Sequence, residues 1–333
     1  MPDRPKVVIT DFITEPLDPE RAILDGTADI IALDARSPSD LNGHIDDADA
    51  LMIYHYLRLD RPHIDRLSHC KIIVRPGVGY DLIDIEAARE NKIPVCNVPD
   101  YGTEEVADSA LAMTLSLARA VHFHNSRLRR ATNSADWSPE PAAPIHRLRN
   151  RNLGIVGCGR IGTATALRAK AFGCNVTIFD PHIPHGVEKA LGVRRVHQLS
   201  DLLTQSHILS LHCPLTDETE NLIGDTELAA LPKGAIIINT ARGAVLDTEA
   251  VVKHLASGHL AGAGIDVLNE EPPPEDSPTL KAWRDPSHPA HDRLLLNPHA
   301  AYYSEEGTHE FRTKAAQEVL RALTNQPLHN QVN

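Results

Sequence analysis

A glycine-rich stretch near the middle of the chain decides its fold: Leu153-Gly154-Ile155-Val156-Gly157-Cys158-Gly159-Arg160-Ile161-Gly162. A run with strand character leads into glycines spaced G-x-G-x-x-G, and an alanine-rich helix follows and closes at Gly173. In such a unit Gly157 permits a tight turn, Gly159 lets a pyrophosphate approach the backbone, and Gly162 lets helix and strand pack closely. The helix N-terminus adds unpaired N–H groups and the positive end of its dipole. The stretch therefore predicts a dinucleotide-binding domain.

An acidic residue ends the next predicted strand, which runs from Asn175 to Phe179. Asp180 can accept hydrogen bonds from the adenosine ribose hydroxyls, and its charge would repel a 2′-phosphate. We therefore predict NAD (NADH in the reducing direction), and not NADP, as the cofactor. The glycine spacing alone would also fit an ordinary loop, but the strand, helix, second strand and acid together favour the dinucleotide.

Length, composition and charge narrow the class of protein. The 333 residues are enough for two domains, and 42% hydrophobic with 23% charged residues is typical of a soluble globular protein. A formal net charge of −12 argues against nucleic acid or an anionic membrane surface as a partner. The N-terminus lacks the apolar region of a signal peptide, and no segment is long and apolar enough to span a membrane.

The cysteines and histidines predict neither disulfides nor a metal site. The five cysteines are an odd number without a C-x-x-C pair, which favours reduced thiols in a cytoplasmic protein. The 19 histidines lack the spacing of a zinc site, so we predict no metal.

The first hundred residues predict a small open α/β domain. Short apolar runs bounded by turn residues or charges are typical of buried parallel strands, and five occur, at 7–10, 30–33, 50–54, 72–74 and 95–98. The loop from Arg75 to Asp81 follows one of them. Its two glycines could let backbone N–H groups converge on an anion, although an ordinary tight turn is the alternative.

The rest of the chain alternates strands and helices from Leu153 onward, and its six predicted strands fit a doubly wound dinucleotide-binding sheet. Thr103 to Val121 is predicted as a long helix and Ser304 to Leu323 as a last one. The stretch from His122 to Asn150 is basic and then proline-rich. It is predicted either as an arm that wraps a second subunit or as an exposed irregular loop.

Three successive strand ends of this half carry ionisable residues: Arg242, then Asp266 and Glu271, then His299. Parallel strands deliver these ends to the edge of the sheet that holds the glycine loop. Reduction of a ketone builds negative charge on its oxygen, and a histidinium can stabilise that charge and donate the proton. A carboxylate partner such as Glu271 would raise the pKa of the histidine, and Arg242 could bind a substrate carboxylate. Each residue alone could be an ordinary surface group, but their coincidence favours a catalytic site.

The chain resembles the D-isomer-specific 2-hydroxyacid dehydrogenase family, and within it the C-terminal binding protein (CtBP-like) branch. The resemblance runs from about residue 6 to the C-terminus. The motifs that carry it are Val74-Arg75-Pro76-Gly77-Val78-Gly79-Tyr80-Asp81, Val95-Cys96-Asn97-Val98-Pro99, Leu167-Arg168-Ala169-Lys170-Ala171-Phe172-Gly173, Asn239-Thr240-Ala241-Arg242-Gly243 and Pro298-His299-Ala300-Ala301-Tyr302-Tyr303-Ser304.

The resemblance implies an NAD-dependent oxidoreductase acting on the CH–OH group of a small 2-hydroxy acid. Arg242 would bind and polarise the 2-oxo acid, His299 would be the acid/base with Glu271 as its partner, and the Val78 and Gly79 amides would hold the substrate carboxylate. Besides the glycine loop, the NAD site would be lined by Thr103, Arg160, Ile161, Asp180, Cys213, Thr240, Ala241, Arg242, Asp266 and His299.

The resemblance also implies two Rossmann-like or flavodoxin-like domains, with the NAD-binding domain (102–301) inserted into a discontinuous catalytic domain (1–101 plus 302–333). The substrate would bind in the cleft between them, and the protein would form at least a homodimer.

This sequence departs from the branch at two positions. Tyr302 stands where a tryptophan follows the catalytic histidine, and Gly102 replaces a serine before the hinge helix. The hydroxyl of Tyr302 could alter the preferred 2-oxo acid. His55 matches a position near the substrate, although an ordinary loop histidine is an open alternative. The second functional hypothesis is an NAD(H)-sensing corepressor or scaffold that binds partner peptides.

Overall fold

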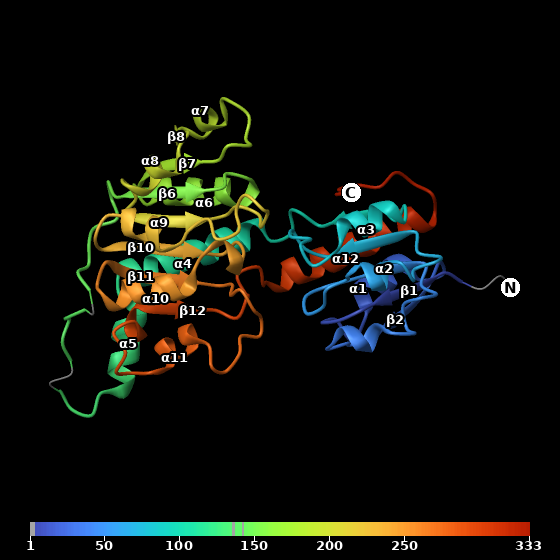
Figure 1. Ribbon diagram of the computed structural model, residues 1–333, viewed down its shortest axis with the longest axis horizontal. Coiled ribbons are helices and arrows are strands. Elements are labelled where there is room, and N and C mark those ends of the chain that lie inside the picture. The colour runs from blue at the N-terminus through green and yellow to red at the C-terminus, as the bar shows by residue number, and fades with distance from the viewer. Residues whose placement is uncertain (1–3, 135–136, 142) are drawn as a thin grey trace. The chain divides into compact units, whose positions relative to one another are not determined.

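The computed structural model describes residues 4–134, 137–141 and 143–333. The chain forms two compact units: unit 1 is Met1–Gly102 with Tyr303–Asn333, and unit 2 is Thr103–Tyr302. The predicted boundaries, after residues 101 and 301, lie one residue earlier. Each unit is built on an all-parallel sheet with helices, which confirms the predicted α/β class (Figure 1).

Unit 1 contains a five-stranded sheet in the order β2-β1-β3-β4-β5. Its strands are fully buried at the centre because helices cover the sheet, and Val7, Val8 and Ile9 are all inaccessible to solvent. The strand order reverses between β1 and β3, since β2 is added on one side of β1 and the later strands on the other, so loops after these two strands lie where open α/β sheets bind ligands. The elements are β1 (Lys6–Ile9), α1 (Asp18–Leu24), β2 (Asp29–Ala32), η1 (Pro38–Leu41), β3 (Ala50–Met52), α2 (Arg61–Ile64), β4 (Ile72–Arg75), α3 (Ile85–Glu90), β5 (Val95–Asn97) and α12 (Glu305–Leu323).

The two chain segments of unit 1 are joined by a buried ion pair. Helix α12 packs on α1 and β4. Glu20 of α1 is fully buried, and its oxygens accept hydrogen bonds from Arg312 of α12 at 2.6 and 2.7 Å. The last residues then run antiparallel to β5, with the Val332 amide donating to Val95 at 2.9 Å. The C-terminal segment thus covers an otherwise open sheet edge.

We predict that Glu20→Gln lowers the free energy of unfolding of unit 1 by about 3 kcal/mol or more, because it leaves the Arg312 charge buried without its partner. Urea unfolding would be followed by far-UV circular dichroism and by tryptophan fluorescence, since Trp137 and Trp283 both lie in unit 2. The circular dichroism transition should gain an early phase that the fluorescence lacks.

The control for this variant is Arg21→Gln, at a residue of the same helix, which removes an exposed ion pair between Arg21 and Glu15 (side-chain exposures 41% and 62%). It should change the free energy of unfolding by less than about 1 kcal/mol. Equal effects of the two variants would contradict the importance of the buried pair.

Unit 2 contains a seven-stranded sheet in the order β12-β11-β10-β9-β6-β7-β8. Helix α4 packs closely on β10 and β11. Glycines make this possible, because a Cβ at Gly262 or Gly264 would lie 2.8 Å from Leu117 or 2.9 Å from Met113 of α4. The elements are α4 (Thr103–Ala118), α5 (Val121–Arg130), β6 (Asn152–Val156), α6 (Arg160–Ala171), β7 (Asn175–Phe179), α7 (Val187–Leu191), β8 (Arg194–Val196), α8 (Leu199–Leu203), β9 (Ile208–Leu211), α9 (Asp225–Ala230), β10 (Ala235–Asn239), η3 (Gly243–Val245), α10 (Thr248–Ala256), β11 (Leu260–Ile265), α11 (Pro278–Arg284), η4 (His291–Arg293) and β12 (Leu294–Leu296).

Three features of unit 2 differ from the sequence-based expectation. The sheet has a seventh strand, β8, beside β7. The helix predicted to continue to Val121 stops at Ala118, and Ala120 turns the chain with a φ of 53°. Helix α5 then occupies part of the segment predicted as an irregular arm or loop. Residues 135, 136 and 142 of that segment lie outside the described residues.

All five cysteines are free thiols, as predicted. Burial raises the pKa of the Cys70 and Cys96 thiols to about 12 and that of Cys213 to about 11. In the described part of the chain, no helix combines the length and apolar character needed to cross a bilayer.

Candidate active site

The glycine loop connects the end of β6 to the start of α6. Gly157 has a φ of +86°, and a Cβ there would lie 2.6 Å from the Cys213 amide nitrogen. A Cβ on Gly162 would lie 2.0 Å from the carbonyl oxygen of Gly157, so the third glycine is required for helix and loop to meet. A Cβ on Gly159, by contrast, would meet nothing within 4 Å. The fold itself therefore does not need a glycine at 159, whereas a phosphate lying against the backbone would.

The Asp180 carboxylate supports this loop from the end of β7. One oxygen accepts the Cys158 amide at 2.8 Å, and the other accepts the amides of His182 at 2.8 Å and Ile183 at 3.2 Å. A carboxylate offers about four lone-pair positions, so capacity remains for a ribose hydroxyl. The sequence indicated only the ribose role, and the structure adds that Asp180 also holds the turn in place.

A second anchor beside Asp180 was missed by the sequence reasoning. The Arg195 guanidinium donates to the Asp180 carbonyl oxygen at 2.6 Å. Arg195 lies on β8, the strand that was not predicted, so no sequence signal placed it near the cofactor edge.

At the end of β10, the turn that carries Arg242 is fixed by Asn239. The Asn239 side chain accepts the Ala241 amide at 3.0 Å and donates to the Arg242 carbonyl oxygen at 2.9 Å. Gly243 follows against Leu268, where a Cβ would lie 2.0 Å from the Leu268 carbonyl carbon. The preceding Thr240 is buried, and its hydroxyl has no hydrogen-bond partner among the described residues. An unsatisfied buried hydroxyl at this edge suits a bound polar ligand.

His299 and Glu271 form a close pair at the ends of β12 and β11. Nδ1 of His299 lies 2.6 Å from Oε2 of Glu271, and both side chains are partly exposed (22% and 29%). Oε1 of Glu271 accepts the Leu268 amide at 2.8 Å, which fixes the carboxylate. The ring of Tyr302 stands nearly perpendicular to the imidazole, with the ring centroids 6.3 Å apart. Because Nδ1 is held by Glu271, the opposite ring nitrogen, Nε2, points away from this carboxylate.

Asp266 holds the backbone of the His299 loop. It is 2% exposed, and Oδ1 accepts the amides of Ala300 and Ala301, each at 3.0 Å. The Asp266 carbonyl also accepts the His299 amide at 2.8 Å. Burial raises the pKa of the Asp266 carboxyl, and the charge of His299 and the two loop amides act in the opposite direction. Its carboxylate is thus directed at the loop that carries His299.

The unit 1 residues suggested for substrate binding lie in two loops. The Val78 carbonyl accepts the Asn97 side chain at 2.7 Å, while in the described part of the chain the Val78 and Gly79 amides donate to no backbone carbonyl in the turns and loops. In the other loop, buried Asp11 accepts the amides of His55 at 2.7 Å and Tyr56 at 2.6 Å. Asp11 was not identified from the sequence, because a single aspartate after a strand has no distinguishing pattern.

The parallel order of the sheet brings the glycine loop and the ends of β7, β10, β11 and β12 to one edge of unit 2. Together they define a nicotinamide-dinucleotide-binding domain with the His299–Glu271 pair at the same edge. Comparison with known proteins agrees: residues 111–301 match the family described as D-isomer specific 2-hydroxyacid dehydrogenase, NAD binding domain. The chain belongs to this family.

Three relatives illustrate the breadth of the family. The chain is 33% identical to D-3-phosphoglycerate dehydrogenase of Methanocaldococcus jannaschii over 97% of its length and 59% of the relative's. It is also 33% identical to C-terminal-binding protein 1 of Caenorhabditis elegans over 91% of its length and 41% of the relative's. The chain therefore spans only about half the length of these two relatives. The structure of D-lactate dehydrogenase from Aquifex aeolicus, complexed with NAD and lactic acid, superposes with a TM-score of 0.85 at 25% identity and covers 96% of both chains.

We predict that Gly159→Ala and Gly162→Ala separate cofactor binding from folding. Gly159→Ala should weaken NADH binding by about tenfold or more through overpacking against the pyrophosphate, while stability changes by less than about 0.5 kcal/mol. Gly162→Ala should lower both the NADH affinity and the free energy of unfolding, since its Cβ collides with the loop backbone. NADH fluorescence titration and urea unfolding of both variants provide the measurements. Unchanged NADH affinity in Gly159→Ala would place the pyrophosphate elsewhere.

Proposed function

We propose that this protein is an NAD-dependent D-2-hydroxyacid dehydrogenase, which reduces a small 2-oxo acid to the D-2-hydroxy acid. The observation that carries this proposal is the 2.6 Å contact between Nδ1 of His299 and Glu271, at the sheet edge that also presents Arg242 and the glycine loop. The membership of the family and the NAD-binding domain support the cofactor and the reaction class.

His299 would serve as the acid/base. Because Glu271 contacts Nδ1, the opposite nitrogen, Nε2, is the one that we assign to the substrate oxygen. NADH, when bound, supplies the hydride to the carbonyl carbon. Negative charge that grows on the carbonyl oxygen would be neutralised by the proton on Nε2, and the same nitrogen would accept that proton in the oxidation.

Arg242 would bind the carboxylate of the 2-oxo acid and polarise its carbonyl. A guanidinium is a planar, permanently charged donor that matches a carboxylate, and it stabilises charge where the oxyanion forms. The Asn239 side chain supports this role because it fixes the backbone from which Arg242 projects. We propose Arg242 as both a catalytic and a substrate-binding residue.

We further propose the remaining contacts. Val78 and Gly79 would donate amide hydrogen bonds to the substrate carboxylate, and His55 and Tyr302 would contact the rest of the substrate. Open space beside Gly159 and the unsatisfied Thr240 hydroxyl support the cofactor assignment. The other proposed cofactor contacts are Thr103, Arg160, Ile161, Asp180, Cys213, Ala241, Asp266 and His299.

We predict that His299→Ala lowers kcat by roughly 10²–10⁴-fold and leaves the NADH affinity nearly unchanged, because only proton transfer is lost. Initial rates of NADH oxidation on glyoxylate, hydroxypyruvate, pyruvate and branched or aromatic 2-oxo acids would measure the effect.

The matched control is His254→Ala. His254 is another histidine of unit 2 that contacts a carboxylate, Asp225 at 3.0 Å, but it lies on helix α10. The kcat of the His254→Ala variant should equal that of the unmodified protein. A kcat unaffected by His299→Ala would remove His299 from the mechanism.

We predict that Asp180→Asn relaxes the preference for NAD over NADP. The substitution keeps one of the two acceptor oxygens for the loop amides and removes the charge that repels a 2′-phosphate, and the nearby Arg195 could then attract that phosphate. Titration of NADH and NADPH by fluorescence should show the NADPH affinity rising and the NADH affinity falling modestly. Equal affinity for both cofactors in the unmodified protein would contradict the role given to Asp180.

The alternative function is an NAD(H)-sensing scaffold that binds partner peptides. The similarity to C-terminal-binding protein 1 favours it, whereas the His299–Glu271 pair favours the enzyme. Tight NADH binding with no turnover on any member of the 2-oxo acid panel would select the scaffold.

We also propose a cytoplasmic homodimer. Free thiols suit a reducing compartment. Val121 and Leu128 of α5 and Trp137 expose 60%, 37% and 81% of their surface, so the segment predicted as an arm offers apolar surface to a second copy. A solution mass of one chain would contradict the dimer.

A further inference from the structure

A small cavity lies at the edge of the unit 2 sheet opposite to the glycine loop. Its walls come from residues at or before the starts of strands, among them Arg151 before β6, His207 before β9, Ile236 in β10 and Arg293 before β12. The cavity measures about 50 Å³, which is room for a few waters or one small anion. Because the strands are parallel, this amino-terminal edge is remote from the dinucleotide edge.

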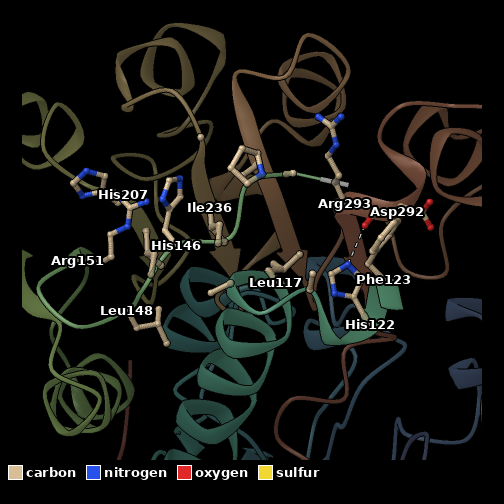
Figure 2. A pocket seen from close by; sticks show the side chains of 17 residues that line it. Leu117, His122, Phe123, His146, Leu148, Arg151, His207, Ile236, Asp292 and Arg293 are labelled. Atoms are coloured by element: carbon tan, nitrogen blue, oxygen red, sulfur yellow. Dashed lines mark hydrogen bonds between the residues drawn. The ribbon is translucent and has the colours of Figure 1, made fainter. Parts of the chain in front are cut away.

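Three cationic or titratable side chains gather on one side of this cavity: His146, Arg151 and His207 (Figure 2). They come from different parts of the chain, since His146 and Arg151 lie in the segment leading into β6 and His207 precedes β9. We call these three residues the cationic cluster. Leu148 and Ile236 lie beside them in Figure 2 and provide apolar walls.

Among the residues that the structure describes, the cationic cluster has no acidic partner. Within the described ranges, none of its three side chains forms an ion pair, although the chain as a whole carries a net charge of −12. The described carboxylate that lines the cavity, Asp292, is bound to Arg130 at 2.9 Å and is drawn on the other side with His122. A gathering of positive groups without counter-charge is unusual in an acidic protein.

His207 shows the consequence of this arrangement. Its Nδ1 is buried without a hydrogen-bond partner among the described residues. Burial lowers the pKa of His207, and the positive charges of Arg151 and His146 lower it further. An anion between these groups would offset the positive charges that lower the pKa of His207, and it would give Nδ1 a hydrogen-bond acceptor.

We propose that the cationic cluster binds a small tetrahedral oxyanion, namely phosphate or the phosphate group of a phosphomonoester. Arg151 can form a forked pair with two of its oxygens, and the two imidazoles can each donate one further hydrogen bond. The cavity has room for one such group, and apolar residues such as Leu148 and Ile236 form part of its lining. This site is separate from the pyrophosphate position, which lies at the opposite edge of the same sheet.

The experiment titrates inorganic phosphate into the 333-residue chain saturated with NAD, so that the glycine loop is already occupied. Chloride keeps the ionic strength constant. Imidazole C2–H signals are followed by NMR, and the signal of His207 is assigned with His207→Gln. We expect a saturable shift of this signal and a rise of the pKa of His207 with phosphate bound. Glycerol phosphate, titrated in the same way, tests the phosphomonoester: competition with phosphate assigns the site to both forms, and no binding assigns it to the free anion.

The matched variants are Arg151→Gln and Arg147→Gln. Arg147 lies in the same basic segment but does not line the cavity. Arg151→Gln should weaken phosphate binding by about tenfold or more, the worth of a charge-assisted hydrogen bond, while Arg147→Gln should leave it unchanged. Equal weakening in both variants, or a His207 signal that does not respond to phosphate, overturns the proposal. Neither readout depends on turnover, so the result is independent of the proposed enzymatic function.

Discussion

The geometry of the candidate site depends on the buried carboxylate of Asp266. Its oxygens accept the amides of Ala300 and Ala301, and its carbonyl accepts the amide of His299. His299 has a φ of 51°, a left-handed conformation that costs a non-glycine residue roughly 1–3 kcal/mol unless its surroundings enforce it. Helix α4 adds a further restraint, since the Ser109 hydroxyl donates to Ala301 at 3.0 Å. The end of β11 thus holds the end of β12, and the imidazole meets Glu271 because both strands are fixed at one edge.

The sequence was sufficient for the parallel α/β class because parallel strands buried on both faces appear as apolar runs, as in 7–10 and 235–239. It failed where that signal is weak. Strand β8 has the sequence Arg194-Arg195-Val196, and its edge position leaves the arginines in contact with solvent, so no apolar run marks it. The break between α4 and α5 was missed for another reason: Ala120 has high helix propensity, and only tertiary packing selects its positive φ.

Residue types at the carboxyl ends of strands singled out Arg242, Glu271 and His299 as candidates without any structure, because topology alone brings such ends together. Several residues that hold the surrounding backbone were not found. Asn239 fixes the Arg242 turn, Arg195 binds the Asp180 carbonyl and Asp11 binds the amide of His55, and a single polar residue carries no periodic signal of such a contact. Even Asp180, which the sequence did identify, has a second task in holding the Cys158 amide that only the fold defines.

The two edges of the unit 2 sheet differ in the charge that their backbone supplies. Helix N-termini at the carboxyl edge attract phosphates directly, whereas the amino edge receives helix C-termini, whose dipoles carry about half a negative charge each and repel anions. Ala118, the last residue of α4, lines the cavity there. An anion at this edge must therefore be bound by side chains. Arg151 is always charged, and its charge helps to lower the pKa of His207. A bound anion would raise the pKa of His207, and protonation of His207 would raise the affinity for the anion by the same factor. Binding at the amino edge is for this reason coupled to proton uptake, in contrast to the backbone-dominated binding at the glycine loop.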